Sequence, residues 1–235
     1  MKIAMLILCH KAPEQIKMFI KAMKNSDITF FLHVDKKSKI DTRELEQENV
    51  IFISDQDRVD VQWAKISQVD AELALLNKAY HTGEFDYFWL CSGQDFPIKS
   101  TRYIISKLSQ NTSINYLNLF DTLNYNLGRC CKYDKRNQIK FENWIISRNL
   151  FVRVLKRGYI ELTGGYNKTF KIFRRNNFTG LKFYFGSQWW CLNRGMIKWI
   201  FEYLKKNPMY YKYFSKCLCP DESFFHTLVM NSPYR

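Results

Sequence analysis

A strand–turn–helix pattern near the middle of the chain most strongly constrains its fold. Residues 85–92 form an apolar, aromatic-rich run that is typical of a buried strand. The run stops at Gly93, Asp95 follows, Pro97 cannot donate to a sheet ladder, and Ser100 can then cap a helix. In an open α/β sheet this unit places ligand-binding groups at the carboxyl edge, so Asp95 is a candidate site residue. The alternative is that the Asp95 side chain only stabilises its own turn.

Strand and helix patterns alternate through the first half of the chain. We expect strands at 2–8, 28–34 and 50–53, with helices opening at Pro13 and near Trp63. Further expected elements are a strand at 114–120, an apolar aromatic run at 183–192, a helix from Arg194, and a helix that starts at Pro220 with Asp221 and Glu222 in its first turn. This order predicts an α/β fold with a mostly parallel central sheet and helices on both faces, in one domain that spans residues 1–235.

One segment carries most of the positive charge. The net charge is +14, and between Arg129 and Lys182 there are 14 Lys and Arg residues against 3 Asp and Glu residues. Residues 121–182 also lack a clear period, so we expect a basic, loop-rich insertion over the active edge of the sheet. Such a patch suits phosphates, an acidic glycan or an anionic membrane surface. The alternative is a solvated surface without a partner.

Several classes of protein lack support in the sequence. Phosphate-binding GxGxxG and GxxxxGK[ST] loops and the GxSxG elbow are absent, and the four histidines are scattered. No nucleic-acid-binding signature accompanies the positive charge, so we expect no nucleic acid partner. No run approaches the roughly 20 apolar residues of a membrane span. The seven cysteines show no paired metal spacing, which favours reduced thiols in a cytoplasmic protein.

Carboxylates supply the candidates for chemistry. Glu222 follows Pro220 at a helix start, where the helix terminus would lower its pKa and an apolar wall would raise it. Asp55 and Asp57 have the spacing of a metal-binding pair, but Arg58 follows at once and no third acidic ligand is nearby. We therefore expect no metal at this pair. Glu222 is a candidate general base, and the alternative is a simple partner of the helix dipole.

Six motifs occur together and in order along the chain. They are Leu8-Cys9-His10-Lys11, His33-Val34-Asp35, Val59-x-Val61-x-Trp63 with Ser67, Ser92-Gly93-Gln94-Asp95-Phe96-Pro97, Gly186-Ser187-Gln188-Trp189-Trp190 and Pro220-Asp221-Glu222-Ser223-Phe224-Phe225. As a set they resemble the core-2/I-branching β-1,6-N-acetylglucosaminyltransferases and the related peptide O-xylosyltransferases. The resemblance implies a GT-A nucleotide-sugar fold and an inverting transfer from a UDP-sugar. It also implies that no metal is used and no other cofactor is needed.

The resemblance also implies roles for individual residues. Glu222 matches the catalytic base. The expected donor-binding residues are His10, Asp35, Arg58, Trp63, Asp95 and Ser187. The expected acceptor-binding residues are Gln188, Trp189, Trp190 and Asp221. The tryptophans could offer flat walls to sugar rings, and we expect at least one of Trp63, Trp189 and Trp190 to lie in the core instead.

Two departures from the family pattern qualify the expected activity. Xylosyltransferases carry an acidic residue where Gln188 stands, so the resemblance favours UDP-GlcNAc as donor and an acceptor glycan as partner. Metal-free members offset the diphosphate charge with basic residues well beyond the Pro-Asp-Glu motif, whereas this chain ends at Arg235. Either the chain is a fragment or the basic insertion supplies those charges. The alternatives are a xylosyltransferase-like enzyme and a non-catalytic module that binds glycans or polyanions. We expect a cytoplasmic location, with peripheral contact at an anionic inner membrane.

Overall fold

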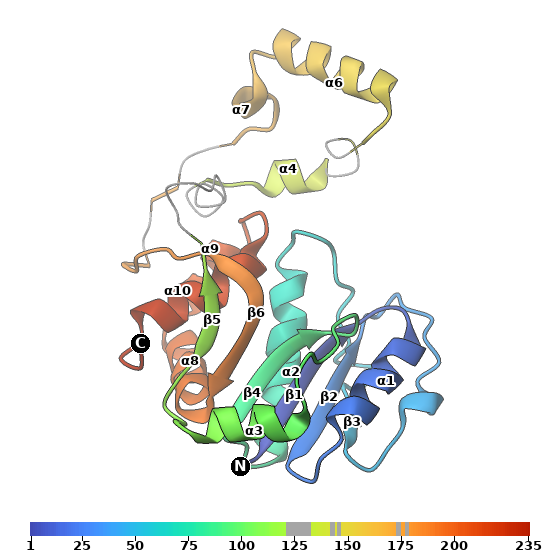
Figure 1. Cartoon of the computed structure of the whole chain (residues 1–235). Coiled ribbons are helices and arrows are strands. Elements are labelled where there is room, and N and C mark those ends of the chain that lie inside the picture. The colour runs from blue at the N-terminus through green and yellow to red at the C-terminus, as the bar shows by residue number, and fades with distance from the viewer. Residues whose placement is uncertain (121–132, 142–143, 145–146, 173–174, 177–178) are drawn as a thin grey trace.

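The computed structural model of the chain is shown in Figure 1. The residues that the structure describes are 1–120, 133–141, 144, 147–172, 175–176 and 179–235. Part of the expected insertion, residues 121–132 with Cys130 and Cys131, lies outside the described residues.

A six-stranded sheet forms the centre of the molecule, in the order β3-β2-β1-β4-β6-β5. The strands are β1 (Ile3–Cys9), β2 (Ile28–Val34), β3 (Val50–Phe52), β4 (Tyr87–Ser92), β5 (Tyr116–Leu119) and β6 (Gly186–Asn193). Strand β1 pairs in parallel with β2 and β4, and β2 pairs in parallel with β3. Strand β6 is antiparallel to both of its neighbours. The prediction of a mostly parallel sheet is therefore confirmed.

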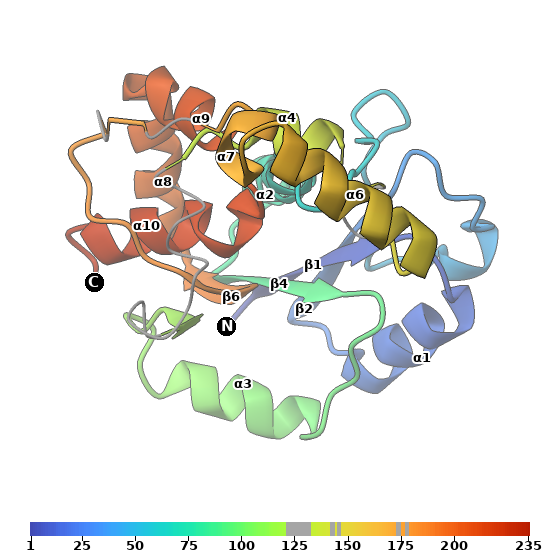
Figure 2. The same ribbon diagram turned by 90° about the horizontal axis from the view of Figure 1, so that it is seen from above.

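Helices cover both faces of the sheet. The described helices are α1 (Pro13–Met23), α2 (Ser67–Thr82), α3 (Thr101–Ser109), α4 (Arg136–Lys140), α6 (Leu150–Leu162), α7 (Tyr166–Thr169), α8 (Arg194–Lys206), α9 (Pro208–Phe214) and α10 (Phe224–Asn231), with 3₁₀ turns η1 (Arg43–Leu45) and η3 (Pro220–Glu222). Helices α1 and α3 pack on one face, and α2, α8 and α10 pack on the other. Figure 2 shows these two layers from above.

Strand β1 explains why both faces need cover. Its alternate residues enter different cores: Ala4 and Leu6 face the α2 side, whereas Ile3, Met5 and Ile7 face the α1 side. A strand without polar positions is stable only when both of its faces are buried, as in parallel α/β sheets. The central position of β1 therefore follows directly from its sequence.

The turn after β4 forms as expected. Gly93 donates its backbone N–H to the Leu8 carbonyl, 2.8 Å away, and a side chain at Gly93 would place its Cβ only 2.8 Å from the Cβ of Cys9. Close approach of two chain segments therefore requires glycine here. The Ser100 hydroxyl accepts the N–H of Tyr103 at 3.3 Å and caps α3.

Two local expectations differ from the structure. The helix expected from Trp63 begins at Ser67, because Ala64 adopts a left-handed φ of 61° that interrupts a helix. The helix expected from Pro220 is divided into η3 and α10, because Ser223 has a φ of −139° that no helix adopts. The apolar, aromatic run at 183–192, for which no element type was predicted, supplies most of β6 from Gly186 onward.

The prediction of a loop-rich insertion was wrong for part of that segment. Helix α6 covers 13 residues of it, and α4 and α7 are shorter helices on either side. The Asn149 side chain accepts the N–H groups of Phe151 and Val152, which caps the start of α6. Figure 1 shows α4, α6 and α7 beyond the carboxyl ends of the parallel strands.

The described cysteines are free thiols. Cys9, Cys91, Cys191 and Cys217 are buried, and Cys219 is half-buried. Burial raises the pKa of the Cys9 thiol to about 12, so this group remains protonated at neutral pH. No helix in the described part of the chain is long and apolar enough to span a bilayer.

Candidate active site

A polar cleft lies at the carboxyl edge of the sheet. Its cavity has a volume of about 330 Å³. Its lining includes the polar and aromatic side chains of His10, Asp35, Trp63, Ser92, Gln188 and Trp189. They come from the ends of β1, β2 and β4, from the loop before α2, and from β6. A larger, more apolar cavity of about 550 Å³ lies between α3 and strands β5 and β6, away from the polar groups. The chemistry therefore points to the smaller cleft.

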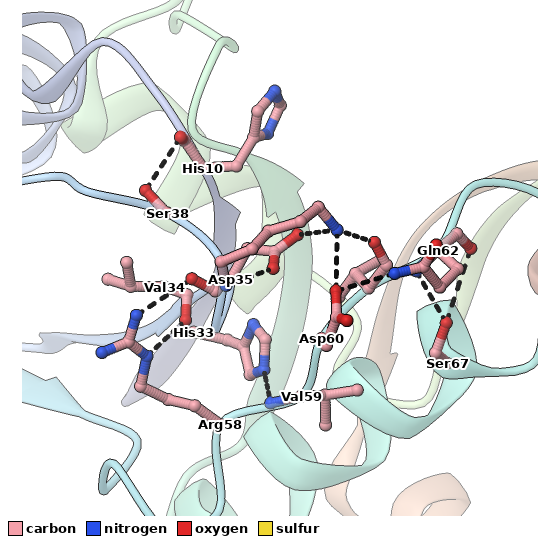
Figure 3. A network of polar contacts seen from close by, with 12 residues as sticks. His10, His33, Val34, Asp35, Ser38, Arg58, Val59, Asp60, Gln62 and Ser67 are labelled. Carbon is pink, nitrogen blue, oxygen red and sulfur yellow. Dashed lines mark hydrogen bonds and ion pairs between the residues drawn. The ribbon is translucent and has the colours of Figure 1, made fainter.

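A buried histidine fixes one wall of the cleft (Figure 3). His33 Nε2 accepts the backbone N–H of Val59 at 2.9 Å. This bond assigns the ring proton of the neutral form to Nδ1. Burial lowers the pKa of His33 to about 4, so the ring is neutral at physiological pH and holds the 59–63 segment against β2.

Arg58 fastens the end of β2. Its Nε donates to the Val34 carbonyl at 2.8 Å, and its Nη2 donates to the Asp35 carbonyl at 2.9 Å. Its Nη1 pairs with Asp55 at 2.8 Å. Because all three nitrogens of the guanidinium contact the chain itself, Arg58 acts as a positioning residue in this structure. Direct contact between Arg58 and a donor stays a prediction.

The carboxylate expected to bind the nucleoside is held in place by Lys37. Asp35 is buried, and its Oδ1 accepts the Lys37 N–H at 3.1 Å while its Oδ2 pairs with Lys37 Nζ at 3.0 Å. Lys37 Nζ also reaches Asp60 Oδ1 at 3.1 Å. Partial burial opposes the charged ammonium, but the hydrogen bonds to Asp35 and Asp60 outweigh it and raise the pKa of Lys37. Asp35 is thus rigid where it lines the cleft.

The aspartate pair considered for a metal has other partners. Asp55 pairs with Arg58, and Asp57 Oδ2 accepts the Ser54 hydroxyl at 2.5 Å. Across the described ranges, no group of three or more His, Cys, Asp and Glu side chains is arranged to hold a metal ion. The contacts of Asp55 and Asp57 are those of residues that stabilise their own loop.

A cluster of carboxyl groups lies where α2, β6 and η3 meet. Glu72 of α2 is fully buried, and its Oε1 accepts the Gln188 side-chain amide of β6 at 3.4 Å. Turn η3 packs against both α2 and β6 and brings Asp221 and Glu222 to the same place. Glu72 Oε2, Asp221 Oδ1 and Glu222 Oε2 are buried atoms that meet no hydrogen-bond partner among the described residues. Such groups are costly to ionise.

The three carboxyl groups differ in how readily they ionise. Burial, and then the charge of Asp221, raise the pKa of Glu72 well above its usual value. Burial, and then the charge of Glu222, raise the pKa of Asp221 to about 7. Burial also raises the pKa of Glu222, which is only half-buried. Environments that separate the pKa values of neighbouring acids distinguish a proton donor from a base. Glu72 is fully buried and is the hardest of the three to ionise, whereas Asp221 and Glu222 are both half-buried.

Two strained residues fix η3 beside the cleft. Cys219 has a left-handed φ of 49° immediately before Pro220, and Ala64 has a φ of 61° immediately after Trp63. The Cys219 N–H donates to the Ala64 carbonyl at 3.0 Å and joins the two segments. Left-handed non-glycine residues cost on the order of 1–3 kcal/mol and concentrate at functional sites.

The tryptophans divide as the sequence suggested. Trp63 is 62% exposed at the cleft, and Trp189 is half-buried and also lines it. Trp190 is 3% exposed and packs on Phe225 in the core, with ring centroids 5.1 Å apart. The expectation that at least one of the three lies in the core is confirmed. The Trp190 ring has no face on the cleft, which argues against its expected contact with an acceptor.

Of the other predicted site residues, His10 lines the cleft, whereas Asp95 and Ser187 do not. Asp95 Oδ2 accepts the Ser92 N–H at 2.8 Å, so the side chain stabilises its own turn, and Gln94 lines the cleft instead. Asp95 borders a separate cavity of about 250 Å³ on the α1 side. Ser187 is half-buried in β6 and is not part of the cleft lining. His10 lines the cleft with an exposed ring that points away from the Asp35 carboxylate (Figure 3).

Sequence reasoning missed Glu72. The signal was present, because Glu72 lies three residues after Val69 and four before Leu76, on the apolar stripe of α2. An acidic residue on a buried stripe is rarely found without a partner. The buried residues of α2 also include Leu75 and Ala79, so the buried face of this helix is wider than the line through Val69, Glu72 and Leu76.

The sheet, its two helix layers and the cleft at the carboxyl edge form a GT-A-like glycosyltransferase fold. A model of the Core-2/I-Branching enzyme family matches residues 3–234. The chain therefore belongs to the Core-2/I-branching enzyme family.

Curated relatives match nearly the whole chain. Xylosyltransferase 1 of Rattus norvegicus is 24% identical over 247 aligned residues, which cover 99% of this chain and 26% of that protein. Xylosyltransferase 1 of Homo sapiens is 24% identical over 243 residues, which cover 99% and 22%. The xylosyltransferase of Ciona intestinalis is 25% identical over 236 residues, which cover 97% and 24%. The chain thus spans about a quarter of the length of these relatives.

Proposed function

We propose that this protein is an inverting glycosyltransferase that transfers GlcNAc from UDP-GlcNAc to a hydroxyl of an acceptor glycan, without a metal. The observation that supports this proposal is the half-buried Glu222, held by η3 beside the fully buried Glu72 and the half-buried Asp221. Glu222 removes the proton from the acceptor hydroxyl as that oxygen attacks the anomeric carbon. UDP leaves from the opposite face, and the new linkage is β.

The carboxyl cluster is suited to a single base. If Glu72 and Asp221 retain protons, Glu222 can ionise without a second negative charge against it. Burial raises the pKa of Glu222 toward the pH at which a base works most efficiently. Asp221 stays in the proposal as a residue that borders the acceptor and controls the charge of Glu222.

The other wall of the cleft is suited to the donor. Asp35 presents a fixed carboxylate that can accept hydrogen bonds from the nucleoside, and Trp63 offers an exposed ring for stacking. Lys37 and Arg58 already bind carboxylates or carbonyls of the chain. We therefore expect the diphosphate to draw its counter-charges from the basic residues of 121–182. Electrostatic stabilisation of this kind is often the largest contribution to catalysis.

A second donor has its own support. The relatives reported above are named xylosyltransferases, which favours UDP-xylose. Gln188 supports UDP-GlcNAc instead, because the resemblance places an acidic residue there in xylosyltransferases. A non-catalytic module on the same fold would bind glycans without turnover.

A donor panel tests the proposal. The purified chain is mixed with UDP-GlcNAc, UDP-xylose or UDP-galactose, each with and without EDTA, and UDP release and donor binding are measured. We expect binding and slow hydrolysis of UDP-GlcNAc that EDTA does not change. Preference for UDP-xylose would select the second candidate. Loss of activity with EDTA would contradict metal-free transfer, and glycan binding without any turnover would support the non-catalytic module.

A further inference from the structure

Helix α6 carries an unusually exposed apolar face. Leu150 is 72% exposed, Phe151 is 71% exposed and Leu162 is 89% exposed. Val154 and Leu155 add further exposed apolar area between them. Such side chains are normally buried or scattered singly on a surface. Five of them on one helix of 13 residues indicate a face that contacts something.

The apolar face points away from the rest of the molecule. The half-buried positions Val152, Lys156 and Ile160 recur every four residues and define the inner side of α6. At about 100° per residue, the five exposed apolar residues fall within an arc of about 140° roughly opposite that side. Figure 1 shows α6 at the outer limit of the molecule, beyond the carboxyl edge of the sheet.

Basic residues border this face. Arg153 and Arg157 lie along one edge of the apolar arc, and both are exposed. The one acidic residue of α6, Glu161, pairs with Arg157 at 3.2 Å. The segment from Arg129 to Lys182 carries 14 basic and 3 acidic residues. An apolar face with a strongly basic border is the pattern of a helix that lies in a membrane interface.

We propose that α6 docks this protein on an anionic lipid bilayer. The apolar face enters the boundary between headgroups and acyl chains, and Arg153 and Arg157 contact headgroup phosphates. Charge favours this occupant over a second copy of the chain, because a symmetric pairing of α6 helices would bring two basic borders together. Docking through α6 directs the carboxyl edge of the sheet, with its cleft, toward the bilayer surface. The proposal goes beyond the proposed function, since it does not depend on the sugar that is transferred.

Vesicle flotation of the purified full chain tests the proposal without any activity measurement. One set of vesicles contains phosphatidylcholine alone, and the other contains phosphatidylcholine with phosphatidylglycerol. We expect binding chiefly to the anionic set. The double variant Leu150→Ser with Phe151→Ser should lower the partition coefficient at least about tenfold, because both side chains lose favourable transfer into the apolar phase. Arg153→Gln should lower it about fivefold on anionic vesicles only.

Matched variants elsewhere on the surface serve as controls. Ile98 is 93% exposed in the loop before α3, and Ile98→Ser should leave partitioning unchanged. Lys198 is exposed on α8, and Lys198→Gln should do the same. Far-UV circular dichroism and thermal unfolding of each variant establish that it remains folded.

Three results would overturn the proposal. The first is failure of the wild-type chain to float with anionic vesicles. The second is flotation of the Leu150→Ser/Phe151→Ser variant equal to that of the wild type. This result would mean that the protein binds vesicles through its surface charge and not through the apolar face of α6. The third is a dimer of the wild-type chain in sedimentation equilibrium without vesicles, abolished by the same variant, which would make a second copy the occupant.

Discussion

The side-chain amide of Gln188 donates to Glu72 Oε1 across 3.4 Å and joins β6 to the buried face of α2. This contact explains how a carboxyl group that is fully buried can be accommodated beside η3. An amide can donate to Glu72 in either protonation state, so Gln188 adds no charge to a cluster that already contains Asp221 and Glu222. The resemblance to xylosyltransferases places an acidic residue at this position, and the structure makes that difference testable.

Gln188→Glu should destabilise the protein at neutral pH. The new carboxyl group would lie against Glu72, and its ionisation at neutral pH would add a negative charge to a site that already contains Glu72, Asp221 and Glu222. We expect the free energy of unfolding to fall by about 3 kcal/mol near neutral pH and by less in acid, where both groups are protonated. Urea denaturation in both conditions measures the difference.

A double variant provides the control for this prediction. Glu72→Gln combined with Gln188→Glu exchanges the amide and the carboxyl group and should recover most of the lost stability. A Gln188→Glu protein that is as stable as the wild type at every pH would show that the contact does not hold the cluster.

Asp221 should make stability depend on pH. Its pKa is raised from 3.8 to about 7 by burial, and then by the charge of Glu222. Between about pH 4 and pH 7 the folded state therefore binds a proton that the unfolded state releases, so stability decreases as the pH rises. The loss across this window is roughly 4 kcal/mol at most.

The comparison of two variants isolates this effect from other titrating groups. Asp221→Asn should flatten the pH profile of the free energy of unfolding across that window. Glu48→Gln, at an exposed position, should leave the profile as in the wild type. Identical slopes for Asp221→Asn and the wild-type chain would mean that Asp221 ionises normally in the folded protein.

Arg58→Lys should weaken donor binding although it conserves charge. A lysine cannot donate to the Val34 and Asp35 carbonyls together, as the guanidinium does. We expect the end of β2 to loosen, the free energy of unfolding to fall by about 1–3 kcal/mol, and the dissociation constant for UDP to rise about tenfold. Calorimetric titration with UDP measures the latter.

The control for Arg58 is another arginine that bonds only locally. Arg43 is exposed and pairs with Asp41 two residues earlier, so Arg43→Lys should change neither quantity. If Arg58→Lys binds UDP as tightly as the wild type, the conformation at the end of β2 does not determine donor affinity.

The central sheet could be predicted because hydrophobic patterning and topology reinforce one another. The apolar runs that became β1, β2 and β4 are continuous, and the helices between them have clear stripes. Helix α6 could not be found in this way, because its apolar residues meet no core and alternate with arginine and lysine. Hydrophobic patterning identifies a helix by the stripe of apolar side chains that it buries, and none of the described side chains of α6 is buried.

The candidate site was predicted only in part, for physical reasons. Glu222 and Asp35 could be proposed as site residues because they follow recognisable local signals, a proline turn and a strand end. The pKa of Glu222 is raised by burial among segments that are distant in sequence, so the direction of this shift could not be derived from the helix terminus alone. Likewise, only the contacts of Arg58 show that it binds the chain itself.

The measurement that most directly tests the account is the transfer rate of Glu222→Gln, with UDP affinity determined on the same preparation. Glutamine keeps the size of the side chain but cannot accept a proton, so we expect transfer to fall about 10²–10⁴-fold while the dissociation constant for UDP is unchanged. Asp57→Asn, at the aspartate that bonds Ser54, should retain full activity. A Glu222→Gln enzyme that transfers sugar at the wild-type rate would contradict the role of Glu222 as the base.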